Sequence, residues 1–332
     1  MNWSGFIAIV VLTLYLPVAQ AETLRWRMSA EMPKGNFNTK VAEEFVQNVR
    51  RVTDGELDIT VAPSSVLAKR SEVVGKLEAG EFEIGDVFLS SVDSEDPVFA
   101  LDSIPFLATS PEQARLLWEV TRPAIEERLL RRGIRVLYAV PWPPQNLYTN
   151  QAVHSMADFE GKGFRSYNPT LSRMAMLMGA KPLVLTTYEA PDAFRAGEIM
   201  AMLTSATTGL DLKAWTFTTH LYDIRAFIPK NVVMVNEAAF QKLSPRAQNG
   251  LLNAAGRAEV QGRKLSWSIA EYQQRMLKRM GLTVVSELPP DLAKGFERIG
   301  DTLIADWVTQ ASKENQALLD RYRAGVRGLS NE

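Results

Sequence analysis

The sequence predicts an α/β protein built from two lobes. The chain has 332 residues, which is more than one small domain needs. Short strand-like segments alternate with helix-like segments, and this order occurs both before and after a proline-rich segment at residues 141–144. A hydrophobic content of 46% and a charged content of 23% are typical of a folded globular protein.

The first half of the chain alternates strands with helices. Apolar and polar side chains alternate in the outer strands, and the helices carry apolar side chains three and four residues apart. The predicted strands are residues 24–28, 57–61, 84–89 and 136–140. The predicted helices are residues 38–52, 72–77 and 111–130. This order is typical of a lobe with a largely parallel sheet.

The second half repeats the same logic. The predicted strands are residues 162–167, 182–185, 200–204, 232–235 and 282–285. The predicted helices are residues 171–178, 189–195, 245–280 and a segment from residue 290 onward. Ser244 is an N-cap residue and Pro245 fits the first helical position, so they mark the start of the long third helix. That helix is long enough to bridge both lobes.

The proline-rich segment marks a crossing between the lobes. Three prolines within residues 141–144 cannot lie inside a sheet, so they form a stiff exit from the preceding strand, although a surface loop is the alternative. We predict that lobe I contains residues 22–142 and 231–272. Lobe II then contains residues 143–230 and 273–332.

Residues 1–21 are predicted to be a secretory signal peptide. Residues 6–16 form an uncharged apolar run that is too short to span a bilayer, and Pro17, Ala19 and Ala21 follow it in the pattern of a cleavage site. The first five residues contain no Lys or Arg, which departs from the usual pattern, and an uncleaved anchor is the alternative. We expect an exported chain with no stable membrane insertion after cleavage. Because the chain contains no Cys, disulfides cannot stabilise it.

Motifs for catalysis, metal binding and cofactor binding are absent from the sequence. There is no Cys nucleophile, no G-x-S-x-G segment, no phosphate-binding loop and no dinucleotide fingerprint. His154 and His220 are isolated, without the spacing of metal ligands. The net charge of −1 gives no reason to expect nucleic acid as a partner. The sequence therefore predicts no enzymatic activity, and neither a cofactor nor a metal site.

Arg165 is the strongest candidate for a ligand contact. It lies at the end of a predicted strand, and ligands of α/β proteins bind at the carboxyl ends of strands. Its planar guanidinium matches the two oxygens of a carboxylate. The alternative, on spacing alone, is a surface salt bridge.

Several segments, in this order, make the chain similar to a known family. They are residues 53–57, 104–106, 158–165, 179–182, 188–194, 229–231 and 243–245. Together they resemble the extracytoplasmic solute-binding proteins of TRAP (tripartite ATP-independent periplasmic) transporters, over essentially the whole chain after residue 21. The resemblance implies a periplasmic-binding-protein fold whose two lobes, joined by crossing strands and a long helix, close over an organic acid. The acid is then passed to membrane permease subunits.

The same resemblance implies which residues line the ligand pocket. Arg165 matches the arginine that holds the ligand carboxylate, and three further residues fall at pocket-lining positions: Asn168, Tyr188 and Ser205. Sialic-acid-binding members have a second arginine near the position of Gln145, and polar groups near those of Phe37 and Phe88. Trp142 and Trp215 are candidates for further apolar wall, with a place in the core as the alternative.

These departures favour a monocarboxylate with an apolar or aromatic body, since one cation is lost and two aromatic rings are gained. The alternatives are a dicarboxylate-binding member and a ligand-binding protein that serves a sensor. Closure requires hinge motion where the chain crosses between lobes, which we predict around residues 141–146 and 229–231.

Overall fold

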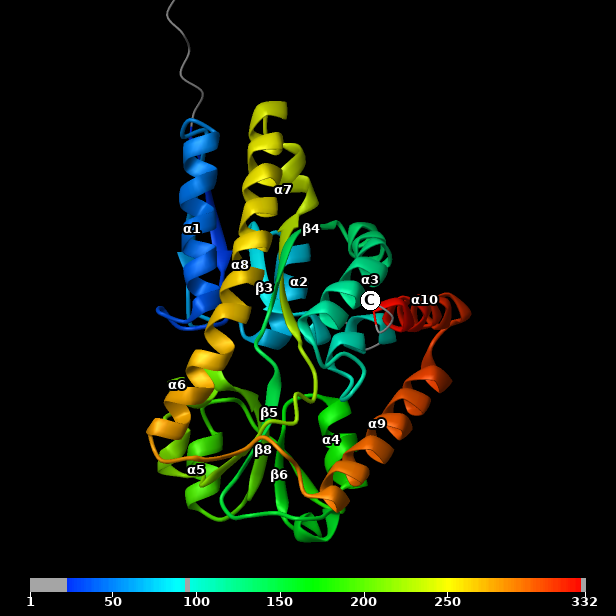
Figure 1. The fold of residues 1–332 in the computed structure, drawn as a ribbon. Helices are drawn as coiled ribbons and strands as arrows, with labels where there is room; N and C mark the ends of the chain where they lie inside the picture. Colours follow the sequence, from blue (N-terminus) through cyan, green and yellow to red (C-terminus); the bar gives the residue numbers. More distant parts are fainter. Residues whose placement is uncertain (1–22, 93–95, 330–332) are drawn as a thin grey trace, which may run out of the picture.

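The computed structural model describes residues 23–92 and 96–329, and the chain forms two lobes with one sheet in each (Figure 1). The predicted signal peptide at residues 1–21 lies outside the described residues. The long helix α8 (Pro245–Arg279) runs along both lobes. Among the helices of the described residues, none is long and apolar enough to cross a bilayer.

The first lobe contains a five-stranded sheet in the order β2-β1-β3-β10-β4. Its strands are β1 (Leu24–Ser29), β2 (Leu57–Ala62), β3 (Ile84–Phe88), β4 (Ile134–Pro141) and β10 (Lys230–Asn236). One face packs against α1 (Phe37–Val52) and α8, and the other against α2 (Val73–Glu78) and α3 (Pro111–Arg131). The short α7 (Glu237–Gln241) follows β10.

The second lobe contains a six-stranded sheet in the order β11-β9-β5-β8-β6-β7. Its strands are β5 (Gln145–Thr149), β6 (Gly163–Ser166), β7 (Lys181–Val184), β8 (Ala201–Ser205), β9 (His220–Tyr222) and β11 (Thr283–Val285). The helices α4 (Pro169–Leu177) and α9 (Pro290–Gln310) cover one face. The other face packs against α5 (Ala190–Arg195), α6 (Ala206–Asp211) and the end of α8.

The structure confirms the predicted α/β class and the bridging helix, and it refines the sheets. Both sheets are mixed, because β10 is antiparallel to β3 and β4, and β5 is antiparallel to β8 and β9. The strands β5 and β9 and the helix α6 were not predicted. Short 3-10 helices fill several connections: Arg70–Glu72, Leu89–Ser91, Pro97–Ser103, Met156–Phe159 and Ala214–Thr216.

Two segments that cross between the lobes lie side by side. The Trp142 backbone N–H donates to the Pro229 carbonyl at 2.8 Å, and the Gln145 N–H donates to the Phe227 carbonyl at 2.9 Å. A buried ion pair lies beside them, in which Lys230 Nζ is 3.0 Å from Asp102 Oδ2. These hydrogen bonds hold the two crossing segments against each other, and the ion pair anchors the second of them at Lys230. Both segments fall where hinge motion is predicted.

The C-terminal helices connect the lobes on the side away from α1. In Figure 1, α9 leaves the second lobe beside α4, and α10 (Lys313–Leu329) ends against α3 of the first lobe. Arg128 of α3 donates to Asn315 Oδ1 at 2.9 Å. Residues 313–329 thus pack on the first lobe, although the predicted limits placed them in the second. The strands within residues 145–222 form the second sheet together with β11, and β1–β4 and β10 form the first sheet.

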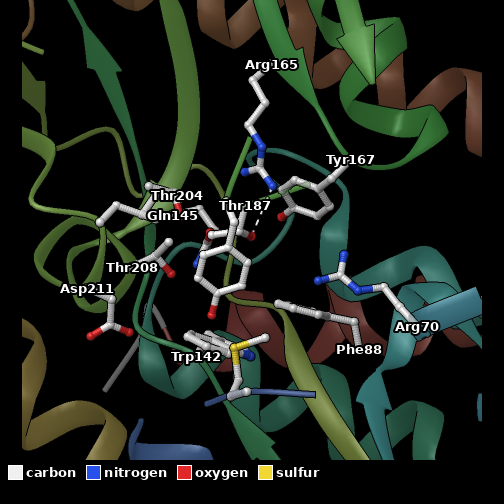
Figure 2. A pocket seen from close by; sticks show the side chains of 13 residues that line it. Arg70, Phe88, Trp142, Gln145, Arg165, Tyr167, Thr187, Thr204, Thr208 and Asp211 are labelled. Atoms are coloured by element: carbon white, nitrogen blue, oxygen red, sulfur yellow. Dashed lines mark hydrogen bonds between the residues drawn. The ribbon is translucent and has the colours of Figure 1, made fainter. Parts of the chain in front are cut away.

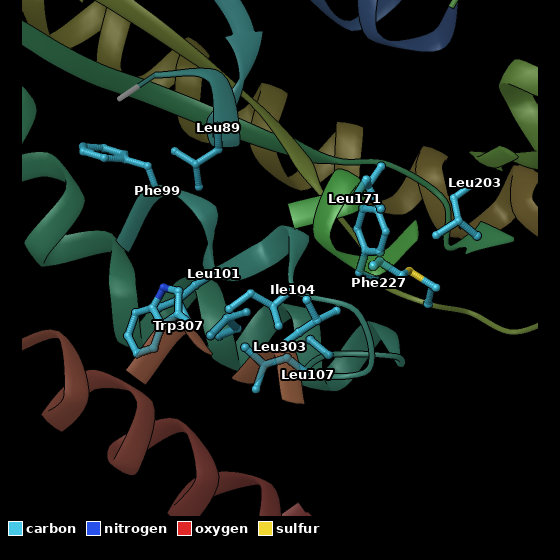
Figure 3. Close-up of a cluster of buried hydrophobic side chains, with 14 of the residues drawn as sticks. Leu89, Phe99, Leu101, Ile104, Leu107, Leu171, Leu203, Phe227, Leu303 and Trp307 are labelled. Carbon is cyan, nitrogen blue, oxygen red and sulfur yellow. The ribbon is translucent and has the colours of Figure 1, made fainter. Parts of the chain in front are cut away.

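One hydrophobic cluster extends through both lobes along this side. Figure 3 shows Leu107 of the first lobe near Leu303 and Trp307 of α9, with Leu171 and Phe227 of the second lobe in the same cluster. All of these side chains are buried. The lobes are therefore joined by packing as well as by the crossing strands.

Candidate ligand-binding site

A cavity lies between the two lobes (Figure 2), and the space not filled by atoms there, its solvent-open mouth included, is about 480 Å³. The first lobe and the crossing segment contribute Met32, Arg70, Phe88, Trp142 and Gln145. The second lobe contributes Arg165, Tyr167, Thr187, Tyr188, Thr204, Thr208, Asp211 and Leu212. Five of these residues lie at the carboxyl end of a strand or directly after it, which is where α/β proteins bind ligands: Phe88, Trp142, Arg165, Tyr167 and Thr204.

Arg165 enters the cavity from the end of β6 and has only neutral hydrogen-bond partners. Its Nε donates to the Leu185 carbonyl and its Nη2 donates to Thr187 Oγ1, both at 3.2 Å. The guanidinium carbon lies 4.9 Å from the centroid of the Tyr167 ring. In the part of the chain that the structure describes, no carboxylate forms an ion pair with Arg165.

The burial of Arg165 makes this missing anion important. The residue is 2% exposed, and burial is the main cause that lowers the pKa of its guanidinium to about 10; Tyr167 and Glu189 oppose this shift and Arg70 adds to it. The group therefore still carries its charge at neutral pH. A buried charge is unfavourable unless an opposite charge compensates it. The cavity thus has a strong preference for an anionic occupant beside Arg165.

A second arginine, Arg70, reaches the same cavity from the first lobe. Its guanidinium forms an ion pair with Glu31, and Nε donates to Glu31 Oε1 at 2.7 Å. It also stacks over Phe88 at 4.6 Å from the ring centroid and lies 5.9 Å from the Tyr167 ring. Because Glu31 neutralises it, Arg70 supplies less free positive charge than Arg165 does.

Arg70 corrects the expectation that this cavity has a single cation. The position near Gln145 does lack an arginine, but Arg70 contributes a second cation from a 3-10 helix that is distant in the sequence. The sequence carries no motif that links this segment to Arg165. The structure alone brings the two together.

Aromatic rings form one wall of the cavity. Trp142 stacks on Phe88, with ring centroids 5.5 Å apart and planes 9° apart. The Trp142 indole N–H donates to Asn231 Oδ1 at 2.7 Å. Phe37 meets Trp142 edge-on at 5.1 Å from behind and does not line the cavity itself.

The opposite wall is polar. Gln145 is held by a hydrogen bond from its Nε2 to the Pro143 carbonyl at 2.9 Å. Thr204 and Thr208 add hydroxyl groups from β8 and α6. Asp211, exposed to solvent on one side, accepts a hydrogen bond from Asn36 Nδ2 of the first lobe at 3.1 Å, and partial burial raises the pKa of its carboxyl.

The nine predicted ligand residues separate into two groups. Arg165, Gln145, Phe88, Trp142 and Tyr188 line the cavity, and Tyr188 is at the mouth with 60% of its surface exposed. Four others do not line it: Phe37, Asn168, Ser205 and Trp215. Their part in ligand binding stays a prediction.

Two of these four residues act as helix caps. The Asn168 side chain accepts from the Leu171 N–H at 2.8 Å at the start of α4, and Ser205 Oγ accepts from the Thr208 N–H at 3.2 Å at the start of α6. Trp215 packs with the apolar cluster beside α5. An N-cap residue and a ligand contact at a strand end both lie between a strand and the helix that follows it. Position in the sequence therefore does not distinguish the two roles.

Several cavity residues were missed by the sequence analysis. They are Met32, Arg70, Tyr167, Thr187, Thr204, Thr208, Asp211 and Leu212. A signal existed for Tyr167, Thr187 and Thr204, since each is next to a predicted strand end or a predicted site residue. No such signal existed for Arg70 or Asp211.

The comparisons with known families identify the class of protein. The model of "Bacterial extracellular solute-binding protein, family 7" matches residues 28–307. The chain therefore belongs to this family, the extracytoplasmic solute-binding proteins of TRAP transporters. Such proteins are solute receptors that act in the periplasm and are not enzymes.

Solved structures resemble the whole described chain. DctP7 of Bordetella pertussis, a receptor binding pyroglutamic acid, is 42% identical with a TM-score of 0.88, covering 91% of this chain and 100% of that one. DctP6 of the same organism, also binding pyroglutamic acid, is 31% identical with a TM-score of 0.87, again covering 91% and 100%. A marine metagenome TRAP protein specific for pyroglutamate is 30% identical with a TM-score of 0.86 and covers 91% of this chain and 99% of that one.

Proposed function

We propose that this protein captures a small monocarboxylate in the cavity between its lobes and delivers it to TRAP permease subunits in the membrane. The observation that carries the proposal is Arg165, a buried guanidinium that lines the cavity and has only neutral partners. A ligand carboxylate there forms charge-assisted hydrogen bonds with the planar guanidinium. It also compensates the charge of the buried guanidinium.

Pyroglutamate, or a ring compound of similar size with one carboxylate, is the proposed ligand. Three relatives between 30% and 42% identical are described as pyroglutamate-binding. The stacked rings of Phe88 and Trp142 offer a flat apolar wall for a ring. Gln145 and Thr208 offer neutral groups for an amide.

The charges of the cavity favour one carboxylate over two. Arg70 is already paired with Glu31, and Asp211 adds a negative charge at the mouth. A second ligand carboxylate would meet a neutralised cation on one side and a like charge on the other. This arrangement makes a dicarboxylate the weaker candidate.

The proposed cycle is conformational and contains no covalent step. In the structure the lobes contact each other across the cavity through the hydrogen bond between Asn36 and Asp211. The ring centroids of Phe88 and Tyr167, one from each lobe, lie 6.2 Å apart. A ligand that contacts both lobes stabilises this closed form relative to an open one. The crossing segments beside Trp142 and Lys230 are the proposed hinge.

Calorimetric titration tests the proposal. The protein is first unfolded and then refolded, so that any ligand bound in the expression host is removed before the titration. We expect pyroglutamate to bind and its uncharged amide to show no measurable binding. At a hundredfold excess over its dissociation constant, pyroglutamate should add about 2.7 kcal/mol to the free energy of unfolding. Equal binding of the amide, or no binding of any monocarboxylate, would overturn the proposal.

A further inference from the structure

A buried carboxylate outside the cavity is connected to its aromatic wall. Asp86 of β3 is 2% exposed, and in the described residues no cation pairs with it. It accepts a hydrogen bond from Asn231 Nδ2 at 2.8 Å, and Asn231 Oδ1 accepts from the Trp142 indole N–H at 2.7 Å. Three side chains thus form a continuous chain of hydrogen bonds from the interior of the first lobe to the cavity.

The sheet places these groups together. Asp86 pairs in register with Val233 and Phe88 with Asn231 in the β3–β10 ladder. Residues two apart on a strand point to the same face, so Asp86, Phe88 and Asn231 share one face of the sheet. Trp142 stacks on Phe88 and bonds to Asn231, so these two contacts of its ring depend on β3 and β10, while Phe37 of α1 adds an edge-on contact.

The hydrogen-bonding capacities of the three groups give the chain one direction. An indole N–H only donates, so its partner must be an oxygen, and the Asp86 carboxyl offers an acceptor oxygen in either protonation state. The Asn231 amide between them must therefore direct its oxygen to Trp142 and its nitrogen to Asp86. Without an acceptor at residue 86, the amide nitrogen is left without a partner and the amide is free to turn.

We propose that Asp86 is a positioning residue for ligand binding: it fixes the Asn231 amide, which in turn fixes the Trp142 ring that the ligand contacts. The effect on ligand affinity rests on the proposed function; the effect on the Trp142 ring does not.

The energetics of Asp86 favour this role over simple packing. Burial, opposed by the hydrogen bond from Asn231 and reinforced by nearby Glu31, raises the pKa of its carboxyl to about 7. Tyr138 of β4, the neighbouring titratable side chain, has a buried hydroxyl without a partner. A group that is unfavourable for folding is retained beside a pocket wall that it orients.

The direct readout is the indole N–H of Trp142, observed by two-dimensional NMR and assigned by its loss in Trp142→Phe. In Asp86→Leu we expect its hydrogen exchange to accelerate at least tenfold and pyroglutamate to bind at least tenfold more weakly. Asp86→Asn keeps an acceptor oxygen, so its indole exchange rate and its pyroglutamate dissociation constant should both stay within about threefold of wild type. Tyr138→Phe, a buried change on the same face, is the matched control and should change neither.

A double substitution separates positioning from general destabilisation. If Asp86 acts through Asn231, adding Asp86→Leu to Asn231→Leu should weaken pyroglutamate binding no further. Urea unfolding of each variant measures its stability independently, and Asp86→Ala replaces Asp86→Leu if the larger side chain prevents folding. Unchanged indole exchange and affinity in the Asp86 variants, or fully additive losses in the double variant, would overturn the proposal.

The two proposals fail in different ways. If wild type does not bind pyroglutamate, the proposed ligand is wrong, and the Trp142 exchange experiment still decides the role of Asp86. If wild type binds and Asp86→Leu changes neither readout, only the positioning role is wrong.

Discussion

Each lobe brings one arginine to the cavity, and the two arginines differ in their partners. In the first lobe, Arg70 is neutralised by Glu31, and the buried Asp86 is tied to Asn231. In the second lobe, the acceptors that the described residues offer to Arg165 are a carbonyl and a hydroxyl. In the first lobe the charge of Arg70 is thus neutralised within the protein, and aromatic rings line the cavity. In the second lobe the charge of Arg165 remains available to a ligand. Counting cations around a pocket therefore overstates the charge that a ligand meets.

The largest expected effect concerns the first lobe and is the pH dependence of stability that Asp86 causes. An unfolded Asp loses its proton near pH 4, whereas the pKa of Asp86 in the folded state is about 7, so its carboxyl keeps its proton over most of that range. Stability is therefore complete below pH 4 and falls as the pH rises to 7. The loss is a few kcal/mol in all, since each tenfold difference in proton affinity between the folded and unfolded chain corresponds to about 1.4 kcal/mol. Asp86→Asn should lack this loss in urea unfolding measured from pH 4 to pH 8.

The exposed Asp320 of α10 provides the matched control for that experiment. Asp320→Asn should follow the pH dependence of wild type. Parallel curves for Asp86→Asn and wild type would show that the first lobe does not hold an unfavourable carboxylate at residue 86.

The next effect concerns the second lobe. Arg165→Ala should weaken pyroglutamate binding by about 10- to 100-fold, because a charge-assisted hydrogen bond contributes about 1.5–3 kcal/mol net. Calorimetry measures the loss. Arg173→Ala, which removes an exposed ion pair with Asp306 on the same lobe, is the control and should bind as wild type does. Undiminished affinity in Arg165→Ala would remove the distinction between the two arginines.

A smaller effect should follow when the charge of the first lobe is released. Glu31→Gln keeps an oxygen for the Arg70 hydrogen bond but removes the neutralising charge. Dicarboxylates such as glutarate should then gain several-fold in affinity, while pyroglutamate changes less. Competition between the two acids reports this selectivity, and an unaltered ratio would contradict the idea that Glu31 neutralises Arg70.

The smallest expected effect tests the rings. Phe37 supports Trp142 from behind, whereas Phe88 lines the cavity. Phe37→Leu should therefore lower pyroglutamate affinity by only about twofold, and Phe88→Leu by about five- to tenfold, since the second change removes a surface that the ligand contacts. The reverse order in calorimetric titrations would place Phe37, and not Phe88, at the ligand.

Local patterns were sufficient for much of the fold and for part of the site. The cap at Ser244 and the apolar spacing after it predicted α8 nearly to its end. Arg165 followed from its place at a strand end. The ion pair of Arg70 and Glu31 did not, because it joins the connection after β1 to a short 3-10 helix, and their approach depends on how strands are ordered in the sheet.

The same limit applies to strands and helices that depend on tertiary contacts. β9 has three residues and is paired on both sides, by β5 and β11, so its conformation comes from its neighbours. The place of α10 against α3 likewise depends on packing, and its amphipathic sequence would suit either lobe.

The hydrophobic cluster that passes through both lobes has a consequence for how the chain folds. Leu107 of the first lobe and Leu171 of the second are buried in one continuous core with α9. Neither lobe can unfold alone without exposing apolar surface of the other. We expect one cooperative transition in urea, with fluorescence and circular dichroism coinciding, rather than two.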